Sequence, residues 1–125
     1  MILDTNALSA LADGERRAVE VVAQSQSVEV PVIVLGEYRL GIAQSRHKGT
    51  YENWLREWIA AVKVLEIQEE TTFTYAAIAL ELKKRGKPIP SNDLWIAALC
   101  RQHSLPILSR DLHFDFVAGL QRIGW

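Results

Sequence analysis

The stretch SNDLWIAALCRQHSLPILSRD, residues 91–111, indicates how this chain folds. Its first part, Ser91–His103, has the length of a helix, and its interior from Leu94 to Leu99 is apolar on every side, which is typical of a buried helix. Its second part, Leu105–Leu108, is a short apolar run that predicts a strand, ended by Ser109-Arg110-Asp111. A helix followed by a buried strand is typical of an α/β domain.

The rest of the chain alternates in the same way. Short apolar runs predict strands at Met1–Leu3, Ser27–Pro31, Val62–Ile67 and around Gln121–Trp125. Strands that alternate with helices predict an α/β fold with a parallel sheet. Helical spacing predicts helices around residues 7–11 and over 16–24 and 32–46. A further helix is predicted from an N-cap at Thr50 through Val62. The last of these helices covers 70–85, and its predicted buried face carries Phe73, Ala76, Ala77 and Leu80.

Length and composition favour one domain spanning residues 1–125. The chain is 49% hydrophobic, yet no run reaches the ~18 uncharged apolar residues that a membrane span needs. The start, Met1-Ile2-Leu3-Asp4, lacks the basic region of a secretory signal. A single cysteine, Cys100, excludes an internal disulfide and a Cys-based zinc cluster, and we expect it to be a core residue. We therefore expect a cytoplasmic protein with no membrane partner.

The net charge of −1 conceals local clusters of basic residues. If four acids belong to one metal site, the other residues carry 14 basic and 11 acidic side chains, a net charge of +3. Bases gather at Lys83–Lys87 and at Arg46-His47-Lys48. Such clusters contact phosphate backbones in some proteins, and in others they complement the negative end of a helix dipole. The sequence leaves both interpretations open.

Four acids stand at informative positions. Asp4 ends the first strand, and Asp111 follows the strand Leu105–Leu108. Because ligands bind at the carboxyl ends of parallel strands, Asp4 and Asp111 share an edge if their strands are neighbours. Asp93 lies in the first turn of the buried helix, and Glu37 lies among apolar residues. Taken singly, each acid has a structural alternative as a helix cap, a turn former, a dipole partner or a solvated side chain.

A cluster of these four acids would have a chemical consequence. Carboxylates that lie close together cannot all ionise without a cation. Oxygen ligands favour Mg²⁺ or Mn²⁺ over zinc, and such ions assist phosphodiester hydrolysis by activating water and stabilising the leaving oxygen. The sequence therefore predicts a metal-dependent hydrolase site made of Asp4, Glu37, Asp93 and Asp111.

Four segments carry a resemblance to a known family. Leu3–Asn6, Gly36-Glu37, Asn92–Ala98 and Ser109–Phe114 resemble, in order and spacing, the motifs of PIN-domain ribonucleases of the VapC toxin kind. The resemblance covers essentially the whole chain. It departs at Ala118-Gly119, where many relatives carry a proline before the glycine.

This resemblance implies a three-layer α/β/α sandwich with a central parallel sheet, like the PilT N-terminus. It implies cleavage of RNA with Mg²⁺ or Mn²⁺, a homodimer, and the role of toxin in a type II toxin–antitoxin pair. A VapB-like antitoxin would then cover the acidic site with a peptide arm. By this resemblance, the principal metal ligands are Asp4 and Asp93. Glu37 is a further ligand or the residue that positions water, and Asp111 completes the site. The supporting polar groups are Thr5, Asn6 and Ser109.

Two other classes of acidic-site protein fit the sequence less well. A receiver domain would need two acids near the first strand and a late lysine, but no lysine follows Arg101. A haloacid-type phosphatase would need a second acid where Asn6 stands. A PIN-like module that binds RNA or a partner without cutting it, and a PIN nuclease outside any toxin–antitoxin pair, stay open as alternatives.

The remaining chemically active side chains point to no second site. His47, His103 and His113 share no helical register and have no acidic partner that the sequence indicates, so we expect surface or structural roles. Trp54 and Trp58 share one helix face, which either packs in the core or serves a dimer or an antitoxin.

Overall fold

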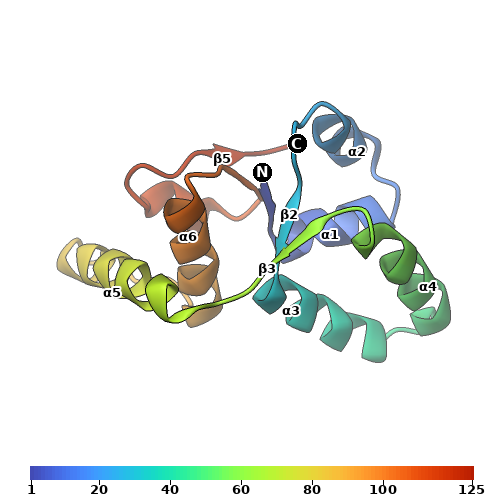
Figure 1. The fold of residues 1–125 in the computed structure, drawn as a ribbon, viewed down its shortest axis with the longest axis horizontal. Helices are drawn as coiled ribbons and strands as arrows, with labels where there is room; N and C mark the ends of the chain where they lie inside the picture. The colour runs from blue at the N-terminus through green and yellow to red at the C-terminus, as the bar shows by residue number, and fades with distance from the viewer.

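A five-stranded parallel sheet forms the centre of the computed structural model, which describes all 125 residues (Figure 1). The strand order is β3-β2-β1-β4-β5, so β1 lies in the middle. In register, Ile2 pairs with both Glu29 and Ile107. The predicted parallel sheet is confirmed, with strands β1 (Ile2–Leu3), β2 (Glu29–Pro31), β3 (Lys63–Leu65), β4 (Ile107–Leu108) and β5 (Arg122–Ile123).

Helices cover both faces of this sheet. Figure 1 shows α5 and α6 on one side and α1, α2 and α4 on the other. Helix α3 packs against α1 and α4 and also reaches α6. This is the three-layer α/β/α sandwich that the resemblance implies. None of its helices has the length and apolar character to cross a membrane. The helices are α1 (Thr5–Ala12), α2 (Arg16–Ala23), α3 (Val32–Ala43), α4 (Lys48–Ile59), α5 (Glu69–Lys84) and α6 (Ser91–His103), followed by the 3₁₀ helix η1 (Leu112–Phe116).

The core gathers around β1, β4 and α6. Both residues of each of these two strands are fully buried, as is the run Ile96–Leu99 of α6. Cys100 is 1% exposed, which confirms its expected place in the core. Residues 91–111 therefore form the central helix and strand that their composition predicts.

The predicted buried face of α5 is wrong. Phe73 and Leu80 are 74% and 53% exposed, and Ala76 and Ala77 are exposed as well. Helix α5 carries apolar residues on several faces, so periodicity alone does not select one. Contacts with α6 select it instead: the Thr71 hydroxyl donates to Gln102 Oε1 at 2.7 Å, and the Tyr75 ring stacks on Trp95 with centroids 4.0 Å apart. The buried residues are Thr71, Ile78 and Leu82.

Helix α4 begins two residues before the predicted N-cap. It starts at Lys48, and Thr50 lies inside its first turn. The Tyr51 amide already donates to the carbonyl of His47 at 3.0 Å, so the first helical hydrogen bond forms upstream of Thr50. On the same helix, Trp54 and Trp58 stack with centroids 5.4 Å apart and pack against the core. Both rings are partly buried, so they pack against the core with one part of their surface and stay exposed with the other.

Candidate metal centre

Asp4 lies buried where β1 passes into α1. It caps α1 by accepting a hydrogen bond from the Thr5 amide to Oδ1 at 2.8 Å. Its other oxygen, Oδ2, accepts from Ser109 Oγ at 2.6 Å and from the Asn6 side chain at 3.1 Å. Ser109 is within reach because it follows β4, the neighbour of β1. The neighbouring strands therefore fix the position of this carboxylate from two sides.

Asp111 lies beyond β4 at the same edge of the sheet. Its amide donates to Ser109 Oγ at 2.9 Å, the hydroxyl that also holds Asp4. Its carboxylate caps η1 by accepting from the His113 amide at 2.9 Å. Asp4 and Asp111 thus follow adjacent strands and share one serine.

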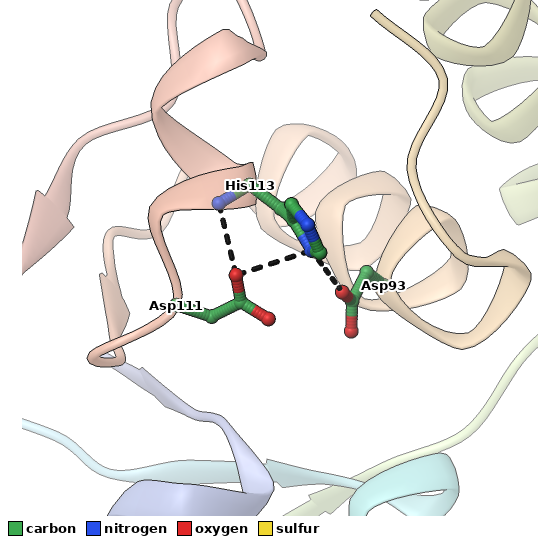
Figure 2. A group of neighbouring side chains, drawn as sticks. All are labelled: Asp93, Asp111 and His113. Carbon is green, nitrogen blue, oxygen red and sulfur yellow. Dashed lines mark hydrogen bonds and ion pairs between the residues drawn. The ribbon is translucent and has the colours of Figure 1, made fainter.

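Asp93 joins this edge from the first turn of α6. Figure 2 shows His113 between Asp93 and Asp111. The His113 Nδ1 atom lies 3.2 Å from Asp93 Oδ2 and 3.1 Å from Asp111 Oδ1. One possible ligand atom from each of these three residues lies within 4.8 Å of the others.

The sequence-based expectation that His113 has no acidic partner is therefore wrong. Helix η1 packs against α6 and brings His113 to Asp93, 20 positions earlier in the chain. That contact is tertiary, so helical register does not reveal it. The available signal is the position of His113 two residues after Asp111, in the turn that follows a strand end.

Glu37 completes the acidic group from α3. It is partly buried, and its Oε1 atom is buried without a hydrogen-bond partner. Burial raises the pKa of Glu37, and the nearby carboxylates of Asp4 and Asp93 raise it further. The ligand atoms that lie within 4.8 Å of one another come from Asp93, Asp111 and His113. Asp4 and Glu37 stand outside that group, but the charge of Asp4 acts on Glu37 and Asp93.

Burial and mutual repulsion also raise the pKa values of the two central aspartates. Burial is the main cause for Asp4; hydrogen bonds from Ser109 and the Thr5 amide oppose it, while the charge of Asp111 adds to it. For Asp93, burial again dominates, the contact with His113 opposes it, and Asp4 and Asp111 raise the pKa further. A cation among these groups would favour their ionised forms.

The donor atoms fit a divalent cation. Asp93, Asp111 and His113 supply two carboxylates and an imidazole nitrogen at close range. Glu37 Oε1 is a buried acceptor without a partner, which a cation would satisfy. The carboxylate oxygens that make up most of this donor set suit Mg²⁺ and Mn²⁺.

The three predicted supporting residues lie in different ways around Asp4. Asn6 donates to both Asp4 and Ser109, and its oxygen accepts from the Arg110 amide at 3.2 Å. Ser109 bonds Asp4 directly. Thr5 reaches Asp4 through its amide, and its side chain lies beside Glu37, whose pKa it lowers. Asp115, another nearby acid, pairs with Arg122 at 2.8 Å instead of joining the cluster.

Comparison with known proteins identifies the family. The PIN domain model matches residues 1–120. The chain is 28% identical to "Ribonuclease VapC2" of Rickettsia felis over 78% of this chain and 75% of that protein. It is 32% identical to "Toxin FitB" of Neisseria gonorrhoeae over 76% of this chain and 73% of that protein.

A solved structure shares the fold. The crystal structure of VapBC2 from Rickettsia felis, bound to a DNA fragment from their promoter, contains a chain that aligns with a TM-score of 0.88. The alignment covers 99% of this chain and 97% of that one at 22% identity, so it is evidence for the fold alone. Together with the family match, the fold establishes that this chain belongs to the PIN domain family.

Proposed function

We propose that this protein is a metal-dependent endoribonuclease that hydrolyses RNA phosphodiester bonds. The observation that carries the proposal is the gathering of Asp4, Glu37 and Asp93 at one sheet edge, where Asp4 and Asp93 raise the pKa of Glu37 and Asp4 raises that of Asp93. Asp111 adds a fourth carboxylate through its contact with His113 and its charge on Asp4. The relative named a ribonuclease supports RNA as the substrate.

Each residue has a role in this proposal. Asp4 and Asp93 are the principal ligands of Mg²⁺, for which Mn²⁺ substitutes; Asp111 completes the site, and Glu37 holds the ion or positions the attacking water. A bound ion of this kind lowers the pKa of water and stabilises charge on the leaving oxygen. Asn6 and Ser109 keep Asp4 oriented through the hydrogen bonds described above.

We also propose that the protein acts in the cytoplasm as the toxin of a type II toxin–antitoxin pair. One relative is named a toxin, and the similar solved structure is of VapBC2. The partner would be a VapB-like antitoxin, with an arm that covers the acidic site. The active form would be a homodimer. A strict monomer by light scattering at tens of micromolar protein would contradict the proposed homodimer.

Cleavage of a mixed RNA pool tests the nuclease. The purified protein is incubated with Mg²⁺, Mn²⁺ or EDTA, beside Asp4→Asn and the matched control Asp115→Asn, which removes the same charge outside the cluster. We expect cutting with either metal, none in EDTA, and a loss of at least about 100-fold in Asp4→Asn alone. Cutting that persists in EDTA, or that survives in Asp4→Asn, would contradict the proposed mechanism.

Growth measurements separate the biological roles. Induction in cells should stop growth for the wild type and leave it unchanged for Asp4→Asn. Metal-dependent cutting in vitro without growth arrest would favour a PIN nuclease outside a toxin–antitoxin pair. A folded protein that binds RNA but neither cuts it nor arrests growth would be a binding module.

A further inference from the structure

A groove of about 270 Å³ leads away from the acidic edge between α1, α3 and α4. Residues of α1 at a spacing of four, Thr5 and Ser9 followed by Asp13, form one wall. Glu37 and Gly41 occupy the same spacing on α3 and form the other. Side chains four apart lie on one helix face, so the groove runs along both helices from the metal centre.

The hydroxyl of Tyr38 lies buried in the groove without a hydrogen-bond partner. Tyr38 is 7% exposed and lines the groove. Burial raises its pKa to about 12, and the charges of Tyr51 and Asp13 contribute to the rise. Thr5 and Glu37 also line the groove, but they belong to the metal centre, where the Thr5 side chain lowers the pKa of Glu37. Buried polar groups are nearly always paired in folded proteins, so the Tyr38 hydroxyl points to a ligand that supplies a partner.

The lining has a definite chemical character. It presents hydroxyl groups and the carboxylates of Asp13 and Glu37, and it contains no lysine or arginine. Without a cation, it does not favour a phosphate group. Hydroxyl groups both donate and accept hydrogen bonds, which matches the mixture of groups on a ribose and a base. Tyr51 already donates its hydroxyl hydrogen to Asp13, whereas the Tyr38 hydroxyl has no acceptor. An arginine side chain of a partner protein only donates, so it would leave the hydrogen of the Tyr38 hydroxyl without an acceptor.

The size of the groove also limits its occupant. Its volume lies just below the range of about 300–1,000 Å³ that holds drug-sized ligands. One nucleoside is a ligand of that scale, whereas a helix or strand of a partner would need a longer channel. The RNA strand that passes the metal centre has to continue beyond it, and the groove begins at Thr5 and Glu37 of that centre.

We propose that this groove binds the nucleoside next to the scissile phosphate and prefers bases with an amino group over uracil. This inference rests on the proposed function, because it assumes an RNA strand at the metal centre. Carboxylates accept hydrogen bonds from the amino groups of adenine and cytosine, whereas uracil presents a carbonyl where cytosine has its amino group. Guanine carries its amino group on another edge of the base, at N2. Asp13 can act in this way because its hydrogen bond from Tyr51, 2.8 Å long, uses Oδ1.

A glycine in the groove allows a test that spares the fold. A Cβ atom added to Gly41 would meet no other atom within 4 Å, so Gly41→Leu fills the groove from an unstrained helical position. Gly49→Leu is the matched control, since Gly49 is equally open and helical but lies outside the groove. Tyr38→Phe removes only the unpartnered hydroxyl. Leucine is a better helix former than glycine, so neither leucine variant should lower stability.

The measurement is the affinity for short oligoadenylate, oligocytidylate and oligouridylate in EDTA, by fluorescence anisotropy. We expect the wild type and Gly49→Leu to bind the adenine and cytosine oligomers about threefold or more tightly than the uracil oligomer. Gly41→Leu should abolish this preference while its melting temperature is unchanged, and Tyr38→Phe should weaken binding about three- to tenfold.

Three results would overturn the proposal. The first is a wild type without preference among the bases, and the second is a preference that survives in Gly41→Leu. The third is a Gly41→Leu protein that keeps its RNA affinity but loses binding of an arginine-containing peptide, which would assign the groove to a protein partner. If the wild type cuts RNA with Mn²⁺ in each of these cases, the nuclease stands and only the subsite fails.

Discussion

At the scale of single residues, Asp4 is a site residue whose burial lowers the free energy of unfolding at neutral pH without metal. The residue is 5% exposed, and burial raises the pKa of its carboxylate from the ordinary value of 3.8. Without metal, the folded protein holds this proton more tightly than the unfolded chain does. The contribution of Asp4 to the free energy of unfolding therefore falls as pH rises from about 4 through the raised pKa.

The substitution Asp4→Asn removes that penalty. In EDTA at neutral pH, we expect its free energy of unfolding in urea to exceed that of the wild type, and the difference to shrink as pH falls toward 4. Asp115→Asn should show the opposite trend, because Arg122 lowers the pKa of Asp115. A wild type that is more stable than Asp4→Asn at neutral pH without metal would contradict this account.

The sequence predicts some of these residues better than others. Asp4 and Asp111 follow short apolar strands, so local pattern and the geometry of parallel sheets place them at one edge. Glu37 and Asp93 reach that edge through the packing of α3 and α6. Their positions among apolar residues and in the first turn of the buried helix mark them as candidates, but helical periodicity does not place them beside Asp4 and Asp111. His113 was missed because its contact with Asp93 spans 20 positions and exists only after η1 packs on α6.

At the scale of elements, α5 is a helix whose buried face helical periodicity does not determine. The strands and helices appear where apolar runs and helical spacing predict them, with ends shifted by a few residues. The buried face of α5 could not be predicted, because two of its faces are apolar. Phe73 and Leu80 lie on one of them, and Ile78 and Leu82 lie on the other. Contacts with α6 decide which of them is buried.

Alanine substitutions on α5 test that orientation. Ile78 is fully buried, so we expect Ile78→Ala to lower the free energy of unfolding by about 2–4 kcal/mol through lost burial and a cavity. Leu80, two positions along and 53% exposed, is the control, and Leu80→Ala should change it by less than about 0.5 kcal/mol. Chemical denaturation measures both. Equal effects, or a larger one at Leu80, would contradict the observed orientation of α5 and support burial of the face that carries Phe73 and Leu80.

At the scale of the whole molecule, folding brings carboxylates close together, and a bound cation would reduce the repulsion between them. An ion that binds only the folded state stabilises it by about 2.7 kcal/mol at a hundredfold excess over its Kd. We therefore expect millimolar Mg²⁺ or Mn²⁺ to raise the melting temperature by several degrees, and Asp93→Asn to lose most of that response. A melting curve unmoved by either ion would contradict a clustered metal site.

The central claim is that the acidic edge binds a divalent ion, because the proposed cleavage depends on it. Titration calorimetry with Mn²⁺ on the wild type, Asp93→Asn and Asp115→Asn tests it directly. We predict saturable binding by the wild type and by Asp115→Asn, and affinity lowered at least about tenfold in Asp93→Asn. Equal affinity in all three proteins, or no binding by the wild type, would contradict the claim.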